Sequence, residues 1–133
     1  MAGWRRPGHP VVLYAAVRLR HGSSPFRQWF DRLDSPAAAK VTTAMTRLSL
    51  GNTSNVKWFE GIGEYVINWG PGYRVYLAKD GSALNVLFTG GTKHRQRADI
   101  ERALALHAEY KARKRAVKRR TENARQRKGE ARS

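Results

Sequence analysis

Two turn signals divide the middle of the chain into three stretches of alternating apolar and polar residues. Residues 64–69, 73–78 and 84–88 place apolar side chains at every second position, which is the period of a β-strand. Pro71-Gly72 separates the first two stretches, and Asp80-Gly81, a strong hairpin signal, separates the second from the third. The sequence therefore predicts a three-stranded antiparallel meander, which Gly90-Gly91 should end.

The segment before the meander predicts one strand and two helices. Residues 11–19 are apolar on both faces of a strand, which indicates a central or covered position in a sheet. Ser24-Pro25 and Ser35-Pro36 each read as an N-cap with proline at the first helical position. Apolar residues follow each pair at helical spacing until Gly51-Asn52. With so few residues between them, the two helices should form a helical hairpin.

A last helix is predicted from about Gln96. Its apolar stripe includes His107, for which a packing role is the ordinary interpretation. Lys111 and Lys114 interrupt the stripe, so the packed helix should end near Tyr110 or continue into solvent as a basic rod or disordered arm. The predicted fold class is α+β: an N-terminal strand, a helical hairpin packed on an antiparallel sheet with a three-stranded meander, and a C-terminal helix.

The length of 133 residues suits one domain with tails. We expect residues 1–10 to be an N-terminal extension, residues 11–110 to form the folded domain, and residues 111–133 to be a basic C-terminal helix or tail. The chain has no cysteine and no apolar run as long as a membrane span, so a cytoplasmic location and no membrane association are expected.

Positive charge dominates the chain and is concentrated at its C-terminal end. Lys and Arg number 26 against 10 Asp and Glu, which gives a formal net charge of +16. Residues 111–133 contain 11 basic and 2 acidic residues, a net +9 in 23 residues, and the preceding 110 residues carry the remaining +7. Such a charge indicates a polyanionic partner, with nucleic acid favoured over an anionic membrane surface.

Several motifs within roughly residues 11–110 resemble a known family. They are Trp29-Phe30-Asp31-Arg32-Leu33-Asp34, Arg47-Leu48 with Gly51-Asn52, Lys57, Gly63-Glu64, Gly70 to Tyr76, Gly90-Gly91 with Lys93, Gln96 and Asp99-Ile100. Their order and spacing resemble the RelE/ParE superfamily of toxins, nearest to its HigB-like branch of addiction-module killer proteins. The resemblance implies a RelE/ParE-like α+β toxin held inactive by a cognate antitoxin, expected here to be a helix-turn-helix protein. Many members cut mRNA in the ribosomal A site, whereas the ParE branch poisons DNA gyrase.

Arg74 is the leading candidate for a catalytic residue. It alternates away from Tyr73 and Val75, so its side chain should leave the opposite face of the strand, and its planar fork can bind two phosphate oxygens. By resemblance, RelE-type toxins place a catalytic arginine at this position. The alternative is an arginine that pairs with Glu64 across the strands.

Lys93 and His94 follow the last strand, where RelE-like toxins often place a basic residue or a histidine against the scissile phosphate. A ribonuclease without a metal needs a base, an acid and cations around the phosphate. Histidine suits proton transfer near neutral pH, so His94 is the candidate for that role and Lys93 for holding the phosphate. An incidental histidine and a solvated loop lysine are the alternatives. Glu64 is either a base or the residue that neutralises Arg74.

One position departs from the family pattern. Where the HigB-like branch typically reads Glu-Leu-Arg-Ile, this chain has Glu64-Tyr65-Val66-Ile67, so Val66 replaces an expected arginine and should pair with Arg74 on one face. The other basic candidates for RNA binding lie on a strand, in the loop and in the tail. They are Lys57, Arg95, Arg97, Lys111, Arg113, Lys114 and Arg115.

Together with the positive charge, this resemblance implies the toxin of a type II toxin-antitoxin system, a metal-independent endoribonuclease that cuts mRNA on the ribosome and inhibits translation. Its expected partners are the antitoxin, the ribosome and mRNA, and no metal or cofactor is expected. The alternative is a binding toxin or regulator without nuclease chemistry that occupies gyrase, the ribosome or a partner protein.

Overall fold

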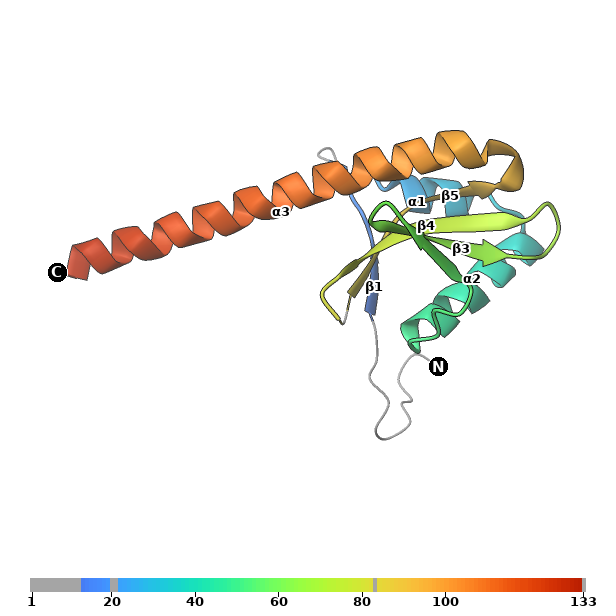
Figure 1. Ribbon diagram of the computed structural model, residues 1–133, viewed down its shortest axis with the longest axis horizontal. Coiled ribbons are helices and arrows are strands. Elements are labelled where there is room, and N and C mark those ends of the chain that lie inside the picture. Colours follow the sequence, from blue (N-terminus) through green and yellow to red (C-terminus); the bar gives the residue numbers. More distant parts are fainter. Residues whose placement is uncertain (1–12, 20–21, 83, 133) are drawn as a thin grey trace.

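The computed structural model of the protein describes residues 13–19, 22–82 and 84–132 (Figure 1). The predicted N-terminal extension, residues 1–10, lies outside the described residues. In chain order the elements are β1 (Leu13–Ala16), α1 (Pro25–Asp31), α2 (Ser35–Ser49), β2 (Val56–Phe59), β3 (Ile62–Ile67), β4 (Tyr73–Asp80), β5 (Leu84–Thr92), the short 3₁₀ helix η1 (Lys93–Arg95) and α3 (Gln96–Arg132).

The strands form a single five-stranded sheet in the order β1-β5-β4-β3-β2. Strands β3, β4 and β5 are the predicted antiparallel meander, and the Val66↔Arg74 pairing expected between the first two is present. Strand β1 pairs parallel with β5, so the sheet is mixed rather than antiparallel throughout. The α+β class is therefore confirmed, and the purely antiparallel sheet is not.

Strand β1 lies at one edge of the described sheet, so of the two predicted positions, central or covered, the central one is wrong. The covered position accounts for its apolar character on both faces. Ala16 packs against the core cluster formed with α1 and α2, and Val17, just beyond the strand, is buried in the cluster formed with α3. A strand covered by helices on both faces needs apolar residues on both, even when it has a strand on only one side.

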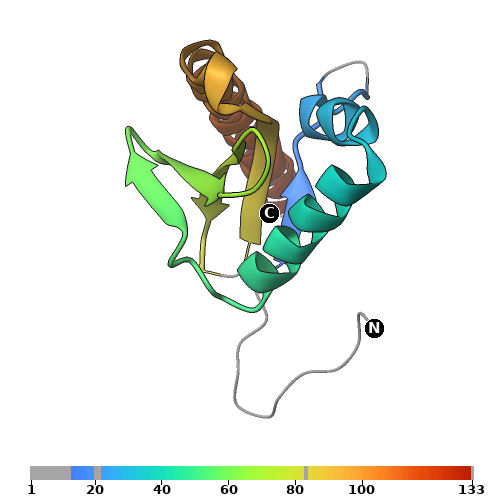
Figure 2. The same ribbon diagram turned by 90° about the vertical axis from the view of Figure 1, so that its right-hand side faces the viewer.

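Helices cover the two faces of the sheet and create two cores. Helices α1 and α2 lie on one face, where Phe26 and Leu48 pack with Val75. The first part of α3 lies on the other, where Ala103 and Leu106 pack with residues that include the buried Phe88. Figure 2 shows the sheet between the α1–α2 layer and α3. Because Arg74 alternates with Val75 of the first cluster, it lies on the face opposite Tyr73 and Val75, as predicted, and α3 covers that face.

The N-caps of α1 and α2 are only partly as predicted. The Ser24 hydroxyl accepts a hydrogen bond from the Arg27 amide at 3.3 Å, which confirms the first cap. In α2 the cap is Asp34, whose Oδ1 accepts from the Ala37 amide at 2.9 Å, and Ser35 is the first helical residue. The prediction for Ser35 is wrong by one position, because the Asp34 carboxylate reaches the third amide of the helix first.

Strand β2 and its hairpin to β3 were not predicted separately. The turn consists of Glu60 and Gly61, with φ of 51° and 83°. Both central residues of this tight hairpin lie at positive φ, a conformation that glutamate rarely adopts. The sequence has Glu-Gly here in place of the usual Asn-Gly or Asp-Gly signal, which is why the turn was not predicted.

Gly90-Gly91 lies within β5 and does not end it, which corrects the prediction. The two glycines are required by close packing on opposite faces of the sheet. A Cβ at Gly90 would lie 2.3 Å from the Trp29 ring, and a Cβ at Gly91 would lie 1.9 Å from Asp99 Oδ2. The strand continues because glycine here serves close approach rather than a turn.

Helix α3 is continuous through residue 110, the predicted end of the packed part, and runs on as a rod (Figure 1). Contacts with the body extend past that residue: the Tyr110 hydroxyl and the Lys114 ammonium both donate to the Asp80 carboxylate. The Lys114 bond, and then the Tyr110 bond, lower the pKa of Asp80. Of the two alternatives, the basic rod is therefore the one present. None of the described helices combines the length and apolar character of a membrane span.

Candidate functional site

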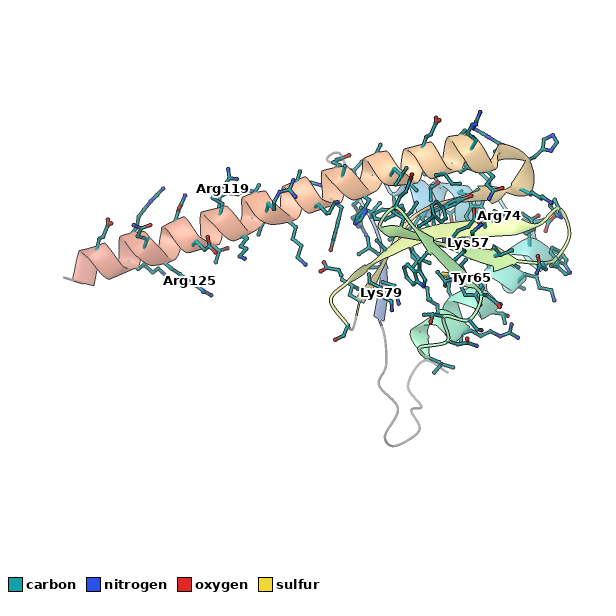
Figure 3. All side chains as sticks on the ribbon, viewed as in Figure 1. Lys57, Tyr65, Arg74, Lys79, Arg119 and Arg125 are labelled. Carbon is teal, nitrogen blue, oxygen red and sulfur yellow. The ribbon has the colours of Figure 1, made fainter. Side chains whose placement is uncertain are left out.

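A row of polar residues crosses the α3 face of the sheet. The pairing register aligns Lys57 with Glu64, Glu64 with Tyr76 and Tyr76 with Thr89, on β2 to β5. Arg74 lies in the neighbouring row, between Val66 and Gly91. Figure 3 shows Lys57 and Arg74 on this part of the sheet. Because side chains two residues apart on a strand share a face, the sheet brings these groups together.

Glu64 is the centre of a buried polar network. It is only 3% exposed, and its Oε2 accepts hydrogen bonds from the Tyr76 hydroxyl at 3.0 Å and from Gln96 Nε2 at 2.8 Å. The same oxygen lies 3.7 Å from Arg74 Nε. Burial, and then the Glu64 charge, raise the pKa of Tyr76 well above its usual range, so the phenol stays protonated as a donor.

The geometry favours one of the two roles considered for Glu64. Its carboxylate is buried, and the Oε2 that accepts from Tyr76 and Gln96 also lies 3.7 Å from Arg74 Nε. Glu64 is therefore placed to neutralise Arg74. Tyr76 and Gln96 hold that carboxylate, and they are the site residues that the sequence did not assign. Their signal was the shared face of Glu64 and Tyr76, which the alternation already implied.

Arg74 and Lys93 meet at Gly72. The Arg74 side chain is 13% exposed, and its Nη1 lies 3.5 Å from the Gly72 carbonyl oxygen. The Lys93 amide donates to that oxygen at 2.9 Å. A Cβ at Gly72 would lie 3.5 Å from Arg74 Nη1 and 3.8 Å from Lys93 Cβ. Gly72, with φ of 78°, thus closes the turn without a side chain between the two cations.

His94, Arg95 and Arg97 are exposed on η1 and the first turn of α3. His94 forms no hydrogen bond, ion pair or ring contact with the part of the chain that the structure describes. No described group therefore orients its imidazole. Lys57 is likewise exposed, on the edge strand β2, beside the buried Glu64.

The four tail residues that the sequence suggested for RNA binding differ in their surroundings. Arg113 is half-buried, with its Nε 3.7 Å from Glu109, and Lys114 is bonded to Asp80, whereas Lys111 and Arg115 are exposed. Further exposed basic residues lie beyond them on the rod and were not singled out. They are Lys118, Arg119, Arg120, Arg125, Arg127 and Lys128. In Figure 3, Arg119 and Arg125 leave opposite sides of the helix.

The aromatic residues and His107 are mainly packing residues, as expected. Trp29 and Trp69 pack against the first core cluster, and the His107 ring lies 5.4 Å from that of Phe88. Burial, and then Lys111, lower the pKa of His107. Trp58 is 43% exposed, with Lys79 Nζ 5.1 Å from its ring centroid, so it does not belong to the core.

Comparison with known proteins shows a relative of this chain but indicates no activity. The chain matches no protein-family model. An uncharacterized protein of Haemophilus influenzae is 38% identical over 86 residues, which make up 63% of this chain and 87% of the Haemophilus protein. The chain belongs to the same family as that protein. Within the described residues, no cluster of three or more His, Cys, Asp or Glu side chains is placed to hold a metal ion.

Proposed function

We propose that the protein is the toxin of a type II toxin-antitoxin pair, a RelE/ParE-like endoribonuclease that cuts mRNA on the ribosome. The observation that carries the proposal is the Arg74 guanidinium, fixed against Glu64 on a basic face with Lys93 beside it at Gly72. The resemblance of the motifs around both cations to that toxin family supports it. A helix-turn-helix antitoxin, the ribosome and mRNA are its proposed partners, in the cytoplasm.

The proposed reaction is a transesterification within the RNA chain. The ribose 2′-oxygen attacks the adjacent phosphorus and loses its proton to a base, and the P–O5′ bond breaks as the 5′-oxygen gains a proton from an acid. The products are a 2′,3′-cyclic phosphate and a 5′-hydroxyl. Negative charge accumulates on the phosphate oxygens, where fixed cations lower the barrier.

Arg74 and Lys93 are the proposed cations for this charge. The network of Tyr76, Gln96 and Glu64 holds Arg74 before RNA binds, so little reorganisation is needed during the reaction. His94 is the proposed proton carrier, because the buried Glu64 is committed to Arg74. Since no described group orients His94, bound RNA would have to fix its imidazole.

A second candidate function is a toxin that binds its target and cleaves nothing. The specific observation in its favour is that Val66 lies opposite Arg74, so this row of the sheet offers one cation, with its side chain only 13% exposed. Such a protein would occupy the ribosome, gyrase or a partner protein. The basic surface serves this function as well as the first.

Induction of the full chain in bacteria, followed by mapping of mRNA ends and of chromosome breaks, separates the two functions. The variants are Arg74→Ala and His94→Ala, with Arg47→Ala as the control because Arg47 is exposed on α2. The nuclease predicts codon-phased mRNA ends that disappear in Arg74→Ala and persist in Arg47→Ala. Growth arrest with intact mRNA would overturn it: broken DNA would indicate a gyrase poison, and intact DNA a binding inhibitor.

A further inference from the structure

A cleft of about 320 Å³ lies between α1 and α3, over the end of β5. The last β1 partner of β5 is Leu87, so residues 88–92 extend beyond the short edge strand, and the cleft opens where β1 has ended. Its floor is residues 89–92. Its walls include Trp29, Arg32, Arg95, Asp99 and Arg102.

Three guanidinium groups line this cleft. Arg32, Arg95 and Arg102 are all exposed, and none lies within ion-pair distance of a carboxylate in the described part of the chain. Like charges gathered in one concave site repel one another, and low-dielectric walls strengthen the repulsion. An anion that enters the cleft relieves it, and arginine forks suit phosphate oxygens in particular.

Asp99 adds a carboxyl group to this cleft of arginines. It is 9% exposed, and its Oδ2 has no hydrogen-bond partner among the described residues. Burial raises the pKa of Asp99, while the nearby Arg95 and Arg102 lower it. A buried carboxyl without a partner is uncommon and costly. The Asp99 carboxyl, with Arg95 and Arg102 near it, suits a ligand that carries a hydroxyl or amino donor as well as an anionic group.

The cleft adjoins the Arg74 site. Gly91, which lines the cleft, pairs with Arg74 across β4 and β5, and Asp99 lies directly over Gly91. The three residues of η1 join the two places, with Lys93 at the Arg74 side and Arg95 in the cleft. A chain of phosphates bound at Arg74 and Lys93 would therefore reach Arg95 and Arg102 next.

We propose that this cleft, formed by Arg32, Arg95 and Arg102 around Asp99, binds the phosphate and ribose adjoining the phosphate at Arg74 in single-stranded RNA. The proposal rests on the proposed RNA-directed function and sets the path of the strand across the protein. Single-stranded RNA fits because the cleft has about the volume of a small-ligand pocket, too small for a duplex. The phosphates meet the arginines, and the ribose hydroxyl meets Asp99.

Binding of the full chain to a fluorescent RNA hexanucleotide without ribosomes, where the proposed ribosome-dependent nuclease does not cut, tests the cleft apart from catalysis. Arg32→Gln and Arg102→Gln should each weaken binding about tenfold. Each should also reduce the slope of log K against log salt by about 0.7. Arg27→Gln is the matched control, since Arg27 is an exposed arginine of α1 that lines a different pocket. It should bind like the wild type.

Three results would overturn the cleft as an RNA site. The first is that both glutamine variants bind the hexanucleotide as tightly as the wild type, and the second is that Arg27→Gln weakens binding as much as they do. The third is that a 5′-mononucleotide displaces the hexanucleotide at a similar concentration to unlabelled hexanucleotide, which would indicate a site for free nucleotides. Thermal unfolding of each variant shows that it is folded. If the wild-type chain does not cleave mRNA in cells but the glutamine variants bind RNA more weakly, the nuclease proposal fails and the cleft proposal stands. If the wild-type chain cleaves mRNA in phase with codons but the variants bind RNA like the wild type, the cleft proposal fails and the nuclease proposal stands.

Discussion

Glu64 and Arg74 lie diagonally across β3 and β4, with 3.7 Å between Glu64 Oε2 and Arg74 Nε. The Arg74 Nε has no hydrogen-bond partner in the described residues, so the Glu64 charge is what compensates this nearly buried nitrogen. The sequence allowed Arg74 to be either a free cation or the partner of Glu64. In the fold it is a partially exposed guanidinium held by that carboxylate.

Replacement of Glu64 by glutamine should destabilise the protein by about 2–3 kcal/mol. The change leaves the Arg74 charge uncompensated, at a cost just below that for a fully buried pair because the guanidinium retains some solvent. Urea denaturation measures it. Glu109→Gln is the control, since its ion pair with Arg113 is partly exposed and should contribute under about 1 kcal/mol. If the Glu64→Gln/Arg74→Met double variant is less stable than Glu64→Gln, the two residues do not compensate each other.

Replacement of Gly91 by alanine should cost about 1–3 kcal/mol of stability, because the new Cβ would overlap Asp99 Oδ2. Asp99→Ala in the same chain should recover most of the loss, and thermal unfolding of the single and double variants measures the recovery. Gly129→Ala is the control: a Cβ there meets no neighbouring atom, so this helical substitution should be neutral or slightly stabilising. An additive double variant would show that Asp99 is not the source of strain.

The bonds from Tyr110 and Lys114 of α3 to the Asp80 carboxylate should make the free energy of unfolding depend on pH in the acid range. Because Lys114 and Tyr110 lower its pKa, Asp80 contributes stability above its ordinary value of 3.8 that is lost as pH falls through its folded-state pKa. Asp80→Asn should therefore be less stable than the wild type at pH 6, by under about 1 kcal/mol because Lys114 is largely exposed. The two curves should converge toward pH 2. If the stability difference between Asp80→Asn and the wild type stays constant from pH 6 to pH 2, these bonds do not depend on the Asp80 charge.

The pKa of Tyr110 is raised to about 12, by burial first and by Asp80 second. The neutral phenol therefore contributes stability that is fully present below pH 10 and is lost as pH rises toward 12. Ultraviolet titration of the phenolates should detect Tyr110 and Tyr76 as late tyrosines, and in Asp80→Asn the Tyr110 transition should return only in part toward the ordinary range, because burial remains. A Tyr110→Phe chain should lose the earlier of these two late transitions and keep that of Tyr76.

Binding of RNA by the part of α3 beyond Lys114 should be electrostatic and independent of sequence. The structure moves the best truncation point beyond the residues that contact the body, so a chain ending at Lys118 keeps Tyr110 and Lys114 in place. It loses six basic residues, namely Arg119, Arg120, Arg125, Arg127, Lys128 and Arg132. If about four of them contact phosphates of single-stranded RNA, the slope of log K against log salt falls by about 3. An unchanged slope would exclude this part of the rod from the binding site.

Local sequence patterns determined the elements but not all of their limits. The alternation around Pro71-Gly72 and Asp80-Gly81 fixed the meander and its Val66↔Arg74 register, because side chains on one face must share one environment. Ser24 and the following proline fixed the start of α1. The hairpin at Glu60-Gly61 was missed, since its conformation is imposed by pairing of β2 with β3 rather than by its own residues.

The composition alone determined that the chain is strongly basic, and the motifs suggested Arg74, Glu64 and Lys93 as a group. Only the tertiary structure decided how they are used. Packing of α3 across the sheet buries Glu64 under Gln96 and turns its carboxylate toward Arg74, and it places Asp99 over Gly91. These contacts join residues on different elements, 8 to 32 positions apart in the chain, and periodicity reports only which face a side chain occupies. What approaches that face depends on the helix folded against it.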